Sequence, residues 1–429
     1  MHHKLNINRV SAILRFDGIW PVETTVTSFK ILNLLFRLFN LTIVVLLTLI
    51  MSADAIVNIN EISLITDNLC FLIGCFETLA KGFKCCIEYK TIIQLINDIY
   101  EPIDIIKKRK NVEVMKWITK LSHFEHRQFL TLFGIVFTLV LARIFSADFK
   151  NREFPVRILV PFNASETPYY HLVYAGISYA ILLVDYSLFG VDVMVIVLMR
   201  YITVQLDILI ANCRHCHNSS IRSVINLPLN KNPKTFERIK NAPDDDNNNE
   251  SNQIKNFVMF EMQENSVFDK NNFDWRFKHC VIHHQKVIDI LNVTNDCFSF
   301  CVVVQILTST ILICLNGFQI ILGNESLHLL MRRFLAITVV LIQLLFWCWY
   351  GNKMSSAAES LTINLWMCGW ENEYKYGIRN TVSIPMILSL QSFELRALGL
   401  VPLSLQTFVS AIKTSYSVLI LLLTVATEQ

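Results

Sequence analysis

The sequence predicts an all-α polytopic membrane protein with seven transmembrane helices, and three observations support this fold class. The 429 residues are 53% hydrophobic and 17% charged, and their mean hydropathy is +0.43. An average soluble chain has about 25% charged residues, and a soluble fold of this size would expose large apolar patches. The chain also contains seven apolar runs of about 20 residues, the length of one bilayer crossing. A soluble enzyme, a disordered protein and a fibrous protein are excluded.

The seven predicted spans are apolar runs separated by charged segments. The second is the weakest because Asp67 and Glu77 interrupt it, and the fourth is longer than one crossing needs. The spans are Ile31–Met51, Ile62–Phe83, Phe129–Ala147, Leu172–Met199, Ser299–Leu322, Met331–Tyr350 and Ser404–Val425.

Lys and Arg predict the orientation, because these residues gather in cytoplasmic loops. With the N-terminus inside, the cytosolic segments carry 29 of the 38 Lys and Arg residues and the extracellular ones carry 5. We therefore expect a cytoplasmic N-terminus and an extracellular C-terminus. No apolar signal region precedes Phe29, so the first helix is expected to act as an uncleaved signal. The sequons at Asn163 and Asn324 fall in extracellular loops and are predicted glycosylation sites.

The predicted orientation divides the chain into segments of different character. Residues 1–30 form a cytoplasmic N-terminal segment, and residues 31–350 hold helices one to six with long cytoplasmic extensions. Within them, residues 226–272 are rich in Asn and Asp and predict a flexible cytoplasmic linker. Residues 351–403 form another cytoplasmic segment, and residues 404–429 hold helix seven and a short extracellular tail.

Placing an ionisable side chain inside a bilayer costs free energy, so such residues within a span usually have a structural or functional role. Glu77 and Lys81 are four residues apart and are expected to pair along the second helix. Asp185 and Asp192 are seven apart, on one face of the fourth helix. Either these groups fix helix packing through internal ion pairs, or one of the two aspartates borders a hydrated cavity.

The sequence has none of the motifs that we would expect of an enzyme active site or a metal site. The stretch Cys213-Arg-His-Cys216-His217 holds one Cys-x-x-Cys pair, whereas a structural zinc site needs a second pair at a defined spacing. The sequence has neither a nucleophile–base–acid arrangement nor a phosphate-binding loop, so we predict no catalytic residue, cofactor or metal ion. The cysteines are expected to be reduced thiols. A net charge of +3 is too small to indicate a nucleic-acid partner.

Seven helices indicate a receptor, but the G-protein-coupled class has its N-terminus outside the cell. The sequence has no Asp-Arg-Tyr after helix three and no Asn-Pro-x-x-Tyr in helix seven. A metabotropic receptor is therefore an alternative that topology disfavours. A transporter is disfavoured because the sequence has no internal repeat.

Motifs along nearly the whole chain resemble the insect odorant receptor family. They are Gly18-Ile19-Trp20-Pro21 near the start, Asp192, Gln205 and Leu209 in helix four, Cys280-Val-Ile-His283-His284-Gln285 before helix five, Cys348-Trp349-Tyr350-Gly351-Asn352 after helix six, Ser360 and Trp370, and the two final stretches Pro402–Phe408 and Lys413–Ser417. The family usually has Tyr where Trp366 stands. A gustatory-type receptor channel is a second alternative, which is disfavoured because the final helix lacks the Gln-Phe of the related gustatory receptors.

The resemblance implies an odorant-gated, non-selective cation channel in which four subunits surround one pore. It further implies a tuning receptor that assembles with a shared coreceptor in the plasma membrane of a sensory neuron dendrite, surrounded by membrane lipid. Such a subunit supplies a pocket for a small volatile apolar ligand in the outer half of helices two, three, four and six. The candidate lining residues are Phe71, Leu72, Val136, Phe137, Val140, Ser178, Tyr179, Leu182, Phe334 and Thr338.

The resemblance also implies a pore and a subunit anchor. The last helix lines the pore in this family, and Ser415, Leu419 and Leu423 recur at four-residue steps that favour one pore-facing stripe. Leucine rings close a pore by dewetting it. A rotated helix would instead turn Val418 or Leu422 to the pore. Subunit contacts are expected in the cytosol, at His283, Trp349 and Trp370.

Overall fold

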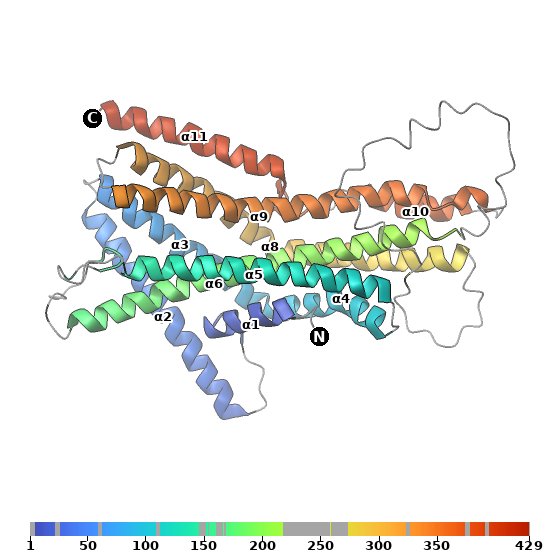
Figure 1. Ribbon diagram of the computed structural model, residues 1–429, viewed down its shortest axis with the longest axis horizontal. Coiled ribbons are helices and arrows are strands. Elements are labelled where there is room, and N and C mark those ends of the chain that lie inside the picture. Colours follow the sequence, from blue (N-terminus) through green and yellow to red (C-terminus); the bar gives the residue numbers. More distant parts are fainter. Residues whose placement is uncertain are drawn as a thin grey trace.

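The computed structural model describes residues 5–21, 26–58, 62–108, 112–145, 152, 154–159, 166, 169–217, 258, 273–322, 327–373, 378–390 and 394–428. Its helices form an elongated bundle along the horizontal axis of Figure 1. They are α1 (Leu5–Phe16), α2 (Thr27–Val57), α3 (Ile62–Ile87), α4 (Tyr89–Lys108), α5 (Val112–Phe145), α6 (Tyr169–Arg214), α8 (Phe273–Leu322), α9 (Leu327–Trp366), the 3-10 turn η4 (Trp370–Asn372), α10 (Ile378–Ser389) and α11 (Leu405–Glu428). The short strands β1 (Arg396–Ala397) and β2 (Val401–Pro402) pair antiparallel before α11.

The predicted all-α membrane fold is confirmed. Within the described residues, six helices are long and apolar enough to cross a membrane, namely α2, α5, α6, α8, α9 and α11. The predicted second span forms α3, which is less apolar because it carries Asp67, Glu77 and Lys81. Each of the seven predicted spans corresponds to one helix.

Several helices are much longer than a bilayer is thick. The 50 residues of α8 extend about 75 Å, against a hydrocarbon core of about 30 Å. The bundle therefore has two halves. The half with α11, the start of α6 and the end of α8 is called the α11 half, and the half with α4, α10 and the end of α6 is called the α4 half (Figure 1).

Helix α6 is the centre of the bundle. Its side chains are buried almost continuously from Ser187 to Cys213, and it contacts α1, α2, α3, α4, α5, α8 and α9. A helix that is apolar on all sides is suited to such a position. Helix α1 packs against α6 and buries Val10 and Leu14 in the same core.

Two glycines fix the path of the chain where a side chain would not fit. Gly18 ends α1 with φ +85°, a left-handed conformation that glycine adopts freely, and its carbonyl accepts a bond of 2.7 Å from Arg37. Gly351 of α9 lies under the turn before α11, where an added Cβ would come 2.5 Å from the Leu403 carbonyl oxygen. The start of α11 is thereby held against the middle of α9.

Two predicted features fall largely outside the described residues. The sequons at Asn163 and Asn324 lie outside them, and so does the predicted linker 226–272 apart from Val258. Val258 is 2% exposed and exchanges two hydrogen bonds of 2.7 and 2.9 Å with the side chain of Asn212 on α6. The predicted segment 351–403 holds the end of α9, η4, α10 and the strand pair.

Candidate functional site

An apolar cluster fills the α11 half between α2, α3, α5 and α6, and we call it the ligand-side cluster. Its buried residues are Val44, Leu47, Met51, Phe71, Cys75, Val140, Ile144, Val156, Ile177, Ala180, Ile181, Leu183 and Val184. Phe71 and Val140 are 5% and 3% exposed, and Leu72, Val136, Tyr179 and Leu182 pack around them. Six of the predicted pocket residues therefore meet in one place, and Ser178 is half-buried on the same helix as Tyr179.

Three other predicted pocket residues lie elsewhere. Phe137 is 42% exposed on α5, and Phe334 is 51% exposed on α9. Thr338 is also exposed, and its hydroxyl bonds the Phe334 carbonyl of its own helix. Helix α2, which was not among the expected pocket helices, supplies Val44, Leu47 and Met51 to the cluster.

Polar groups reach the ligand-side cluster at two points. The Tyr179 hydroxyl donates to the buried Asn40 side chain of α2 at 2.9 Å. The Arg143 guanidinium lies 4.1 Å from the centre of the Phe71 ring. Sequence reasoning missed both Asn40 and Arg143, although a polar residue within an apolar span is itself a signal of function. The cluster thus combines aliphatic and aromatic walls with a few hydrogen-bonding groups, as small-molecule sites do.

A buried ionic cluster, which we call the Lys81 node, joins four helices next to the ligand-side cluster. The Lys81 ammonium is 0% exposed and lies 2.7 Å from both Glu77 of α3 and Asp192 of α6. It also donates to Gln305 of α8, and Gln343 of α9 donates to Asp192 at 2.5 Å. The predicted Glu77–Lys81 pair is confirmed, and Asp192 is part of the same network.

Helix α11 packs on α8 along one face. The Ser415 hydroxyl is buried and donates to the Thr310 carbonyl of α8 at 2.9 Å, and Leu419 lies against Gly317. Leu423 is half-buried. Ser415 therefore lies on the face that is covered within the chain, and a pore-facing Ser415 would require α11 to turn about its axis.

The free face of α11 carries a polar stripe beside exposed apolar side chains such as Val409, Val418 and Ile420. Gln406, Ser410, Lys413, Ser417 and Thr424 are exposed and recur at steps of three, four and seven residues, which is one face of a helix. Leu421 is 63% exposed and follows Ser417 by four residues on this stripe. An otherwise apolar helix thus presents a polar stripe to whatever lies beyond the single chain.

Comparison with known proteins places this geometry in a family. The family model described as 7tm Odorant receptor matches residues 61–416. The chain belongs to the odorant receptor family. Odorant receptor 13a of Drosophila melanogaster is 22% identical over 95% of this chain and 93% of its own length. Odorant receptor 85c of the same fly is 30% identical, but over only 21% of this chain and 23% of its own length.

Solved structures share the fold of this odorant receptor. The insect olfactory receptor OR5 from Machilis hrabei, in complex with eugenol, matches 98% of this chain and 97% of its own with a TM-score of 0.73 at 12% identity. A second structure of the same receptor matches with a TM-score of 0.72. The chain is thus a multi-pass membrane protein of a receptor family, and that family is not one of enzymes.

The predicted anchor residues of the odorant receptor differ in how accessible they are. His283 is 5% exposed, and its Nε2 lies 3.0 Å from the Gln205 side-chain oxygen on α6, so its contacts are within the subunit. Trp349 is 45% exposed on α9. Trp370 is half-buried, and its indole N–H donates to the Trp366 carbonyl at 3.1 Å. Trp349 is thus the most accessible of the three.

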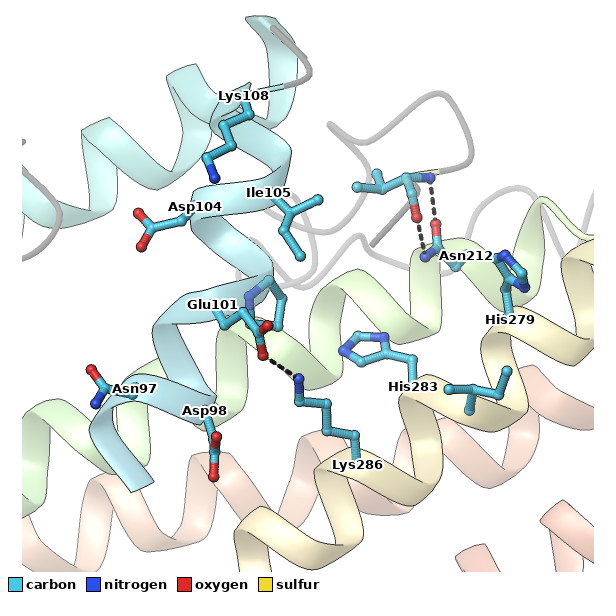
Figure 2. A pocket seen from close by; sticks show the side chains of 13 residues that line it. Asn97, Asp98, Glu101, Asp104, Ile105, Lys108, Asn212, His279, His283 and Lys286 are labelled. Carbon is cyan, nitrogen blue, oxygen red and sulfur yellow. Dashed lines mark hydrogen bonds and ion pairs between the residues drawn. The ribbon is translucent and has the colours of Figure 1, made fainter. Parts of the chain in front are cut away.

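A cavity of about 830 Å³ opens in the α4 half, beside His283 (Figure 2). One wall is acidic, from Asp98, Glu101 and Asp104 of α4, and the opposite wall holds His283 and Lys286 of α8. Lys286 bridges the walls by an ion pair of 2.6 Å with Glu101. Its charged lining differs from the apolar ligand-side cluster, and no motif in the sequence indicated it.

All twelve cysteines are free, and they are buried or half-buried. Cys216 of α6 and Cys280 of α8 bring their sulfur atoms to 3.5 Å. Within the described ranges, no group of three or more His, Cys, Asp or Glu side chains is arranged to hold a metal ion.

Proposed function

We propose that this odorant receptor is a tuning subunit that forms an odorant-gated, non-selective cation channel with a shared coreceptor. The observation that carries the proposal is the family match over residues 61–416, together with a shared fold over 98% of the chain with an olfactory receptor solved with eugenol. The subunit acts in the plasma membrane of a sensory neuron dendrite.

The ligand-side cluster is the proposed odorant site. Phe71, Val140 and Leu182 supply apolar walls, and Tyr179 supplies a hydroxyl already paired with Asn40. A volatile ligand is small and apolar, so its binding is favoured by transfer from water into contact with such apolar side chains. One polar group can then select among ligands of similar size, because a polar partner left unpaired is costly.

The free face of α11 is the proposed pore lining. Gln406, Ser410, Lys413 and Ser417 give it groups that water and ions can solvate. Leu421 interrupts this stripe with an exposed apolar side chain, and a ring of four such residues would close a narrow pore by dewetting. Leu419, which lies against Gly317 of α8, and the half-buried Leu423 are the alternative gate.

The α4 half is the proposed cytosolic part. The Lys and Arg bias of the loops supports this orientation. The exposed Trp349 and Trp366 side chains of α9 support a subunit interface at this level, because tryptophans are enriched at the energetic centres of interfaces.

The experiment is co-expression with a coreceptor in cells that lack other receptors, with a panel of volatiles and a recording of cation current. The proposal expects current with at least one volatile, and expects none when this chain or the coreceptor is expressed alone. Saturable uptake of a volatile without current would favour a transporter instead.

A further inference from the structure

We propose that α8 couples odorant binding to movement of the pore helix α11 through two contacts of different stiffness. One is a rigid ionic joint at the Lys81 node, and the other is a compliant joint between α8 and α11. This inference rests on the proposed channel function and names the residues that would couple its two sites. Thr308 and Ser415 are the positioning residues of the two joints.

The Lys81 node is the rigid joint. Lys81 carries the only positive charge of the node as described, and it faces the two carboxylates Glu77 and Asp192 at 2.7 Å. The Trp347 ring of α9 covers the ammonium at 4.9 Å. Separating such groups within a bilayer would leave unpaired charge in a low dielectric, which is strongly disfavoured. The helices that meet at the node therefore move together.

Helix α8 enters the node through two side chains. Gln305 accepts from Lys81 and donates to Ser309 at 2.8 Å. One turn further on, the Thr308 hydroxyl is 4% exposed and has two close acceptors, Glu77 at 2.9 Å and the Val304 carbonyl of its own helix at 2.8 Å. The bond to Glu77 is the stronger of the two because its acceptor is a carboxylate. The node also has a short route to the ligand-side cluster. Phe71 and Cys75 lie on α3 six and two residues before Glu77, and Asp192 follows Leu182 on α6 by ten residues.

The contact between α8 and α11 is the compliant joint. The Ser415 hydroxyl has two acceptors, the Thr310 carbonyl of α8 at 2.9 Å and the Ala411 carbonyl of its own helix at 2.8 Å. If α11 moves away from α8, the Ser415 hydroxyl keeps its bond to the Ala411 carbonyl, so no buried donor is left without an acceptor. Two turns along α8, Gly317 offers Leu419 a surface without a side chain. Such contacts can be exchanged at low cost.

The two joints lie on neighbouring residues of one helix. Thr308 bonds the node, and Thr310, two residues later, accepts the bond from α11. A ligand that displaces α3 or α6 therefore also displaces α8, because the node holds these helices together. The displacement is accommodated at the contact between α8 and the pore helix α11.

The test compares variants that remove one hydroxyl at each joint, in the complex with the coreceptor. Thr308→Val removes the bond to Glu77, and Ser415→Ala removes the bond to Thr310. Thr308→Val is expected to change the odorant response per surface subunit, in midpoint or maximum, by about three- to tenfold, which corresponds to the free energy of one buried hydrogen bond. Ser415→Ala should change the same response by about two- to threefold, because the acceptor on α8 is a neutral carbonyl and Ala411 offers a second one. Thr308→Ser keeps a hydroxyl and should restore the response. Surface biotinylation measures the amount of each variant.

Matched controls make the same chemical change away from the joints. Thr138→Val and Ser52→Ala each remove a hydroxyl that bonds only its own helix. Gly317→Ala brings a methyl group 3.1 Å from Leu419, whereas Gly134→Ala meets nothing within 4 Å. Both gain the same helix propensity, so only Gly317→Ala should shift the odorant response.

Each outcome decides a separate claim. If Thr308→Val and Ser415→Ala reach the surface and respond as the wild type does, the two joints do not transmit. If Thr308→Ser reaches the surface but fails to restore the response, the Thr308 hydroxyl is not the cause, and the rigid joint is overturned. A wild-type complex without current for any volatile would overturn the proposed channel itself.

Discussion

His283 shows how a buried histidine ties the stability of the receptor to pH. It precedes the predicted span Ser299–Leu322 and is 5% exposed. Burial, with smaller contributions from Lys286 and His284, lowers the pKa of His283 from its usual value to about 3. Burial also lowers the pKa of His284 to about 4. Both side chains are therefore neutral in the folded receptor at physiological pH.

Because the pKa of His283 is lower in the folded chain than in the unfolded one, the unfolded chain binds more protons in acid. Stability is complete above the unfolded pKa of about 6.5 and declines as the pH falls from there towards 3. We expect the purified receptor to lose about 1 kcal/mol of stability between pH 6.5 and 5.5 for each such histidine. A thermal unfolding series in detergent micelles measures this loss.

The matched variants for this prediction are His283→Gln and His123→Gln. Glutamine at 283 cannot titrate but can still bond Gln205, so the pH slope should become shallower and His284 should supply the remainder. His123 is exposed on α5 and serves as the control for replacing a histidine outside the buried core. An unchanged slope in His283→Gln would show that this histidine is not buried as described.

Helix α11 is an element whose two faces carry different chemistry. We expect Ser417→Cys and Leu421→Cys to react with an external thiol reagent during odorant application and to change the current, because they lie on its free face. Ser415→Cys should be silent, since its position is covered by α8. The measurement is the current before and after reagent, with the cysteines of the wild type as background.

The same scan decides between the two registers for the gate. If Leu419→Cys and Leu423→Cys respond while Leu421→Cys is silent, the helix turns from the packing described here when it joins the channel. If no position on α11 responds at any odorant concentration, this helix does not line the pore.

The sequence predicts the positions of the helices well, but it predicts poorly which face of each helix is buried. Apolar runs located the seven helices that correspond to the predicted spans, and a four-residue spacing located the Glu77–Lys81 pair, because both signals are local. The partners Gln305 and Gln343 are distant in sequence and carried no such signal. Phe334 and Thr338 were expected in the pocket but are exposed. In a membrane helix, lipid-facing and core-facing sides are both apolar, so periodicity does not distinguish them.

The orientation of the whole molecule is a prediction that follows from the charge of its loops. We expect an N-terminal tag to be reachable by antibody only after permeabilisation, and a tag after Gln429 without it. Asn163 should carry glycan in insect cells, and Asn163→Gln should remove the corresponding mass. Staining of the N-terminal tag on intact cells would reverse the orientation and favour a metabotropic receptor.

The central claim is that odorant binding opens a pore within the receptor complex itself. It is tested most directly in excised membrane patches that hold this chain and a coreceptor, bathed without nucleotides, while an active volatile is applied to the extracellular face. The account predicts cation current that starts with the volatile, ends with its removal and persists without ATP or GTP. Current that vanishes on excision and returns only with nucleotide would contradict it.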